Sequence, residues 1–244
     1  MAEGKELKLI EKEDAGNKDY LAVSTNELLD AFGKGSHIPG SGSAAALSGL
    51  IGAELMRTVI LLSINREGYD KHNTQFEFVL DILNTESLDK FRSLFNSDIK
   101  IFHQVSYHRR LRDTATNGSD EKEFHRKEAI ERLREATDIP IEICESSLKL
   151  MQYAFGIFDT GYAAARGDAG VAISNLLSSA QGALFVVFLN LKSFQKSKWK
   201  DEKMEVAVTL ATKFIEVQKA AYERVITLYN ENTDSRQLTL DFYK

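Results

Sequence analysis

Residues 39–65 read PGSGSAAALSGLIGAELMRTVILLSIN. Beyond the opening turn of proline and glycine, this stretch holds only two charged residues, Glu54 and Arg57. It shows no sustained alternation of apolar and polar residues, which favours a helix from about Ser43 to Asn65. A helix that is apolar on nearly every side needs neighbours all around it, so we expect this one at the centre of a helical bundle.

A second stretch, between Asp168 and Lys192, carries no charged residue. Its length makes it a formal candidate for a membrane span. It nevertheless contains several polar side chains, too many for a single helix in hydrocarbon. These are Ser174, Asn175, Ser178, Ser179, Gln181 and Asn190. We therefore expect both stretches to be buried helices of a bundle, and we expect no membrane partner.

The other helices are predicted from capping signals and periodicity. Ser24 followed by Glu27 is typical of a capping box and predicts a short helix that ends near Gly33. Residues 69–113 predict two helices, or one helix bent near residues 84–87.

A turn at residues 116–120 is expected to start a charged helix through Thr137. Asp138 is then predicted to cap a new helix with Pro140 in its first turn, and an amphipathic helix from about Asp201 to Asn232 ends the bundle. The predicted fold is all-α, an up-and-down antiparallel bundle of about six helices. The helical domain would span residues 24–232, between a polar N-terminal segment, residues 1–23, and a C-terminal tail, residues 233–244.

The composition favours one intracellular domain. A chain of 244 residues with 43% hydrophobic content can bury one substantial core. Its 36 acidic and 31 basic residues leave a net charge of −5, which does not favour nucleic acid as a partner. The single cysteine, Cys144, excludes an internal disulfide, and the first residues do not resemble a signal peptide, so we expect a cytoplasmic protein. Cys144 lies on an apolar helical stripe and is expected to pack in the core.

No motif predicts a bound metal or cofactor. The five histidines show no metal-ligand spacing. The phosphate-binding loop pattern is missing, and the glycines of residues 39–43 do not follow a predicted strand, as a dinucleotide-binding fingerprint requires.

The turn at residues 39–43 is the first candidate for a ligand site. Its glycines permit a tight turn, and the helix that follows opens with the very small residues 44–46. Exposed amides at a helix start, with close backbone approach, can bind an anion or a flat ligand. The alternative is an ordinary helix cap followed by close helix packing.

Asp98 is the second candidate, because it interrupts an apolar helical stripe. The apolar members of the stripe are Phe91, Leu94, Phe95, Phe102 and Val105. A buried carboxylate either finds a partner or has a raised pKa, and such groups concentrate at functional sites. The alternative is a structural hydrogen bond. Asp168 is a further candidate, with a helix N-cap as its alternative role.

Three arginines, Arg109, Arg110 and Arg112, close together in the sequence, leave two interpretations open. The simpler is a solvated helix face, and the other is contact with an anionic ligand tail.

Several segments, taken in order, resemble a known family. Residues 39–46, PGSGSAAA, resemble the PGGGSxAA signature of the formiminotransferase-cyclodeaminase/methenyltetrahydrofolate cyclohydrolase family. Residues 96–102 resemble its DADAxAF helix, and residues 139–141 fall where it has a VPL helix start. Residues 166–172 are similar to its SDAGVA segment and residues 189–191 to its INL segment. The resemblance covers about residues 24–230.

The resemblance implies an up-and-down helical fold, a homodimer, and action on the carbon that bridges N5 and N10 of tetrahydrofolate. Asp98 would be the main acid/base, and Asp168 the second catalytic residue. No cofactor is implied beyond the folate substrate. The substrate would be bound by Pro39, Gly40, Ser41, Gly42, Ser43, Arg166 and Asn190.

The sequence also departs from the family pattern, at Ser41, Asn96, Lys100, Tyr162, Gly167 and Val186. The first interpretation is a methenyltetrahydrofolate cyclohydrolase or a formiminotetrahydrofolate cyclodeaminase. The alternative is a catalytically altered family member that serves as a ligand-binding or assembly protein. The two enzymatic reactions use the same bridging carbon, and the sequence does not separate them.

The end of the chain carries one more short pattern. Residues Gln237 to Phe242, QLTLDF, look like a peptide that binds a sliding clamp. The alternative is a tail that packs back on its own bundle or on a partner subunit.

Overall fold

The computed structural model describes residues 16 and 18–241, with only the backbone of residues 234–241. These residues form helices and no strand, which confirms the all-α prediction. The α-helices are α2 (Thr25–Gly33), α3 (Ser41–Ser63), α4 (Asn73–Ile82), α5 (Leu88–Thr114), α6 (Asp120–Thr160), α7 (Arg166–Lys192) and α8 (Lys198–Asp241). Two 3-10 turns, Asp70–His72 and Ala163–Ala165, and one π-helical turn, Leu83–Ser87, complete them.

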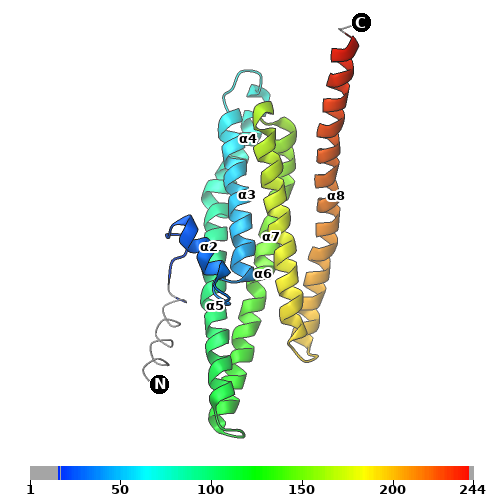
Figure 1. The fold of residues 1–244 in the computed structure, drawn as a ribbon. Coiled ribbons are helices and arrows are strands. Elements are labelled where there is room, and N and C mark those ends of the chain that lie inside the picture. Colours follow the sequence, from blue (N-terminus) through cyan, green and yellow to red (C-terminus); the bar gives the residue numbers. More distant parts are fainter. Residues whose placement is uncertain (1–15, 17, 242–244) are drawn as a thin grey trace.

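The long helices run alternately up and down, as predicted (Figure 1). α3 rises, α5 descends, α6 rises, α7 descends and α8 rises again to the C-terminal end of the chain. The α5–α6 hairpin reaches further down than the other helices, whereas α8 extends above them.

The predicted bend near residues 84–87 is a π-helical turn. It joins α4 to α5 without interrupting the helical path, because Leu83 to Ser87 stay helical with a wider backbone turn. When α4, this turn and α5 are counted as one bent helix, the described chain has six helices, which matches the predicted number.

The predicted helix boundary at Asp138 is wrong. α6 runs without a break through residues 138–140, with Pro140 inside it. Proline has no N–H to donate to the carbonyl four residues earlier, that of Ala136, and this loss usually ends a helix. Here the side chain of Asn190 replaces the missing donor: its Nδ2 lies 3.1 Å from the Ala136 carbonyl oxygen in a buried position. The helix therefore continues past its proline.

The two long, mainly apolar helices α3 and α7 lie side by side in the bundle. Gly52 of α3 faces Leu176 of α7, and Gly182 of α7 faces Ala45 of α3, so the two helices are antiparallel. Both have the length and hydropathy of membrane spans, yet about half of each span's most apolar window is already buried inside the bundle.

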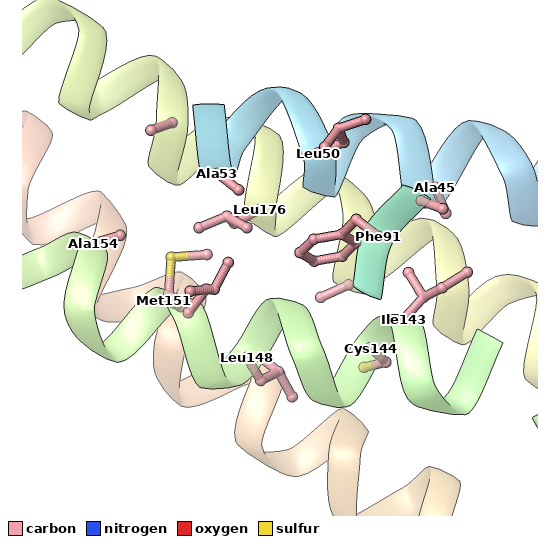
Figure 2. Close-up of a cluster of buried hydrophobic side chains, with 14 of the residues drawn as sticks. Ala45, Leu50, Ala53, Phe91, Ile143, Cys144, Leu148, Met151, Ala154 and Leu176 are labelled. Carbon is pink, nitrogen blue, oxygen red and sulfur yellow. The ribbon is translucent and has the colours of Figure 1, made fainter. Parts of the chain in front are cut away.

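Phe91 of α5 fills the centre of the core (Figure 2). Its ring lies so close to Gly49 of α3 that a Cβ at position 49 would stand 2.3 Å from it. Ile143, Met151 and other side chains of α6 close the opposite side. Cys144 is fully buried among them, which confirms that it packs in the core. This burial raises the pKa of its thiol to about 12.

Two further boundaries can be compared with the sequence. The capping box at Ser24 and Glu27 is present, with both reciprocal hydrogen bonds formed. α8 begins at Lys198 and continues to Asp241, past Asn232, where the sequence predicts its end. The sliding-clamp pattern therefore starts within α8, and its last residue, Phe242, lies outside the described residues.

Candidate functional site

The start of α3 is held by a local network of hydrogen bonds. Gly40 is the N-cap, and its N–H donates to the hydroxyl of Ser43 over 2.9 Å. The same hydroxyl donates to the Gly40 carbonyl at 3.1 Å. The backbone N–H groups of Ser41 and Gly42 lie in the first turn of α3 and have no acceptor among the described residues. The turn therefore presents two unpaired donors.

Asp98 of α5 lies directly against this turn. Its Oδ2 accepts a hydrogen bond from the N–H of Ser43 over 2.7 Å, although the two residues are 55 positions apart. Its Oδ1 lies so close to Gly42 that a Cβ at position 42 would be only 2.1 Å away. The glycine therefore makes room for the carboxylate.

The Asp98 carboxyl group is buried and has no cationic partner among the residues that the structure describes. Asp98 as a whole residue is only 6% exposed to solvent. Burial raises its pKa from 3.8 to about 6, and the hydrogen bonds from Ser43 offset only part of this rise. Desolvation disfavours the charged form, whereas a donor to the carboxylate favours it. Asp98 can thus exchange a proton near neutral pH, as the sequence argument expects of it.

Two cavities lie on either side of the α3 start. The larger, of about 740 Å³, lies between α5 and the loop of residues 34–38. It reaches Phe102, one helical turn from Asp98 on the same face of α5. The smaller, of about 360 Å³, lies between α3 and α7 and is mainly apolar. Both volumes are in the range of small-molecule sites.

Three residues line the larger cavity near Asp98, and none of them is predicted from the sequence as a site residue. They are His37 and Ile38 from the loop, and Phe102 from α5. Phe102 was available as a signal, because it lies four residues after Asp98 on the same stripe. The loop residues carried no signal beyond their place just before the Gly40 turn.

The structure does not bring Asp168 and Arg166 to Asp98 within one chain. Gly161, just before α7, faces Val59 near the end of α3, whereas Gly182 faces Ala45 near its start. Asp168 therefore lies near the far end of α3, about 21 Å along α7 from Gly182.

The side chains at that far end have other partners. Arg166 forms an ion pair with Glu231 of α8 at 2.7 Å and stacks on Phe158. Asp168 is exposed in the first turn of α7, where Ala165 is the N-cap, so the predicted alternative of an Asp168 N-cap is wrong. Whether these two residues act in the site stays a prediction.

Asn190 and the turn residues also have defined positions. Asn190 is 8% exposed and donates to the Ala136 carbonyl, so its amide has an architectural partner. Pro39 is buried, Gly40 is half-buried, and Ser41 lines the smaller cavity. The described residues contain no group of three side chains suited to a metal ion.

Fold and site together define a class: an up-and-down helical bundle in which a buried carboxylate meets a glycine-rich helix start. The chain belongs to the formiminotransferase-cyclodeaminase family, whose model matches residues 24–209.

Three relatives show how far the similarity extends. The methenyltetrahydrofolate cyclohydrolase of Methylorubrum extorquens is 26% identical over 203 residues, which cover 83% of this chain and 95% of that protein. Two formimidoyltransferase-cyclodeaminases, from Sus scrofa and Gallus gallus, are 27% and 25% identical over 69% and 88% of this chain. The matched residues span only 30% and 38% of their lengths.

The fold also matches a solved structure. The crystal structure of formiminotetrahydrofolate cyclodeaminase from Thermotoga maritima superposes with a TM-score of 0.72 at 17% identity. The match covers 85% of this chain and 98% of that one. At this identity it establishes the shared fold.

Proposed function

We propose that this protein is a folate one-carbon enzyme that acts on the carbon bridging N5 and N10 of tetrahydrofolate. Its reaction would be that of a methenyltetrahydrofolate cyclohydrolase or a formiminotetrahydrofolate cyclodeaminase. The names of its relatives support this class. The observation that carries the proposal is Asp98, a buried carboxyl group with a pKa of about 6 beside two unpaired helix amides.

In the hydrolytic reaction, the ligand carries a positive charge delocalised over N5, the bridging carbon and N10. An ionised Asp98 stabilises this cation and accepts a proton from the water that attacks the carbon. A C–O bond forms, and the bridging carbon becomes tetrahedral. The C–N5 bond then breaks as N5 takes up the proton held by Asp98 and the hydroxyl group releases its proton to solvent, which leaves the formyl group on N10.

The amides of Ser41 and Gly42 suit the oxygen of this intermediate. Negative charge develops on that oxygen as the carbonyl group forms, and fixed N–H donors stabilise such charge without reorganisation. In the deamination reaction, the N10 nitrogen attacks the formimino carbon and ammonia leaves, so the same carboxyl group would deliver a proton to the leaving group. One site therefore serves either reaction.

The direct test is turnover by the purified protein. We expect loss of methenyltetrahydrofolate absorbance with wild type, or release of ammonia from formiminotetrahydrofolate. Asp98→Asn keeps the shape of the side chain but cannot accept the proton, so its turnover should fall by about a hundredfold or more. The exposed Asp201 of α8, changed to asparagine, is a matched control that should keep full activity. Equal turnover per folded molecule for Asp98→Asn and wild type would refute the catalytic role.

One observation favours the second function, ligand binding or assembly without turnover. Val186 stands where the family has an asparagine, and it lines the apolar cavity between α3 and α7. If wild type bound folate but converted neither substrate, this function would replace the enzymatic one.

We also propose a homodimer. The outward residues of α3 and α7 are uncharged over most of their length and include Ile51, Phe185 and Leu189, which are exposed. An apolar face of this extent is typical of a surface that a partner covers. A second copy of the chain is the partner that the family resemblance implies.

A further inference from the structure

His108 and His125 form a pair of side chains in the α5–α6 hairpin, in the part that reaches further down than the other helices (Figure 1). The two residues are 17 positions apart, so no local spacing of histidines predicts their contact. The hairpin brings them together from its two helices, with Nδ1 of one ring 3.0 Å from Nδ1 of the other.

Aromatic side chains pack around both imidazole rings. The ring of Phe124 lies 6.4 Å from that of His108 and 5.1 Å from that of His125, measured between centroids. Tyr107 adds a third ring, 5.3 Å from that of His108. Such packing limits the rotation of the histidine side chains, so little conformational entropy is lost when both nitrogens bind a common partner.

The separation of the two nitrogens suits a metal ion bound by both. Imidazole nitrogens bind metals such as Zn²⁺ at about 2.0–2.1 Å. At that bond length, nitrogens 3.0 Å apart subtend about 90–100° at the metal. This is the angle between adjacent ligands in square-planar and octahedral sites, and square-planar nitrogen sites are typical of Cu²⁺ and Ni²⁺. Tetrahedral Zn²⁺ requires about 109° and a wider separation.

The protonation state of the pair is also compatible with a metal. One Nδ1 donates the hydrogen bond and the other accepts it, and a metal ion would replace this shared proton while each Nε2 keeps its own. Burial and the neighbouring His125 lower the pKa of His108, so this ring is mainly neutral at pH 7, as a ligand must be.

The charged groups near His108 are one acid and one base. Glu128 contributes a negative charge and Arg132 a positive one. Arg132 is itself paired with Glu128 at 3.4 Å and with Glu135 at 2.7 Å. The arginine charge is therefore offset by two carboxylates, which leaves the surroundings of His108 able to accept a cation.

We propose that His108 and His125 bind a divalent transition-metal ion, Cu²⁺ or Ni²⁺ in preference to Zn²⁺. The ion would join α5 to α6 across the hairpin, with water at its remaining coordination positions, because the described residues hold no group of three suitable ligands. This site lies outside the proposed reaction centre. His108 is about 15 Å along α5 from Asp98, and neither histidine is among the described residues that line the larger cavity.

The first test is calorimetric titration of the full-length protein, without a histidine tag, with Ni²⁺. We expect one ion per chain with a Kd of about 10 µM or tighter. His108→Gln and His125→Gln each remove one ligand and should weaken binding by about tenfold or more. His72→Gln is the matched control, because His72 lies in the 3-10 turn before α4 and its ring faces Phe76, and it should keep the wild-type affinity.

Melting curves verify that the variants are folded, and Ni²⁺ should raise the melting temperature of wild type and of His72→Gln only. Electron paramagnetic resonance of the Cu²⁺ complex gives a second measurement that needs only wild type. Its hyperfine pattern should show two coordinated imidazole nitrogens. A Kd weaker than about 10 µM, equal affinity in wild type and both ligand variants, or a Cu²⁺ spectrum without two nitrogens would each overturn the site. None of these results bears on the proposed function, which turnover tests separately.

Discussion

Asp98 links the proposed chemistry to the stability of the protein. Its carboxyl group is desolvated, and its pKa is raised from 3.8 to about 6. An acid with a raised pKa binds more protons in the folded chain than in the unfolded chain between these two values. The free energy of unfolding therefore falls as pH rises from about 4 to about 6, and stays lower above that range.

Replacing Asp98 by asparagine should remove this pH-dependent loss of stability. We expect Asp98→Asn to gain stability relative to wild type as pH increases from 4 to 7, by up to about 3 kcal/mol. Urea unfolding at several pH values measures this difference, with the exposed Asp201→Asn as the reference variant. If the difference in unfolding free energy between Asp98→Asn and wild type were the same at pH 4 and pH 7, burial of the charged carboxylate would not destabilise the folded protein.

Gly42 is the second residue on which the site depends. A methyl group at position 42 would overlap the Asp98 carboxylate, since the Cβ would lie 2.1 Å from Oδ1. Gly42→Ala should therefore displace the carboxylate, reduce turnover, and cost roughly 1–3 kcal/mol of stability. Gly167→Ala is the matched control, because no atom lies within 4 Å of a Cβ there. Activity assays and thermal melts of both variants measure the effect, and wild-type behaviour of Gly42→Ala would contradict the close packing.

At the scale of elements, the continuity of α6 depends on a side chain from α7. Asn190 donates to the Ala136 carbonyl, which lacks a backbone donor because residue 140 is proline. We expect Asn190→Ala to cost roughly 1–3 kcal/mol, the cost of leaving a buried carbonyl unpaired. In a Pro140→Ala background, the new N–H can reach the same carbonyl, and the cost should shrink by about 1 kcal/mol.

Denaturant unfolding of the four proteins in this cycle measures the coupling. Asn175→Ala is a control on the same helix. The side chain of Asn175 donates to the Val171 carbonyl, and no proline removes the backbone donor to that carbonyl. It should show no coupling to Pro140→Ala. Additive effects of Asn190→Ala and Pro140→Ala would mean that the Asn190 bond does not substitute for the missing one.

At the scale of the whole molecule, the mainly apolar outer faces of α3 and α7 predict that two copies of the chain associate. Light scattering in detergent-free buffer should give twice the chain mass of 27.4 kDa. Phe185 is 70% exposed on α7, and Phe185→Glu should produce monomers because a buried charge without a partner is costly at an interface. Phe78→Glu on α4 is the control and should leave the dimer intact. Wild type at the monomer mass would remove the dimer proposal.

The sequence alone determined the helical class, the positions of most helices and the identity of the buried acid. Each of these follows from patterns within a few residues. The Ser24 capping box, the bend before Leu88 and the burial of Asp98 in its apolar stripe are examples, and the structure has all three. Helical periodicity and caps depend on near neighbours, so they can be read without a fold.

Only the tertiary structure decided how distant segments meet. It joined Asp98 to Ser43 across 55 positions and Asn190 to Ala136 across 54. The second contact allows α6 to continue through Pro140, where the local sequence predicted a helix boundary. The structure also set Asp168 far from Asp98 within one chain, and it brought the loop before Pro39 against α5 to form the larger cavity. Such contacts depend on the packing of whole helices, which no pattern of adjacent residues encodes.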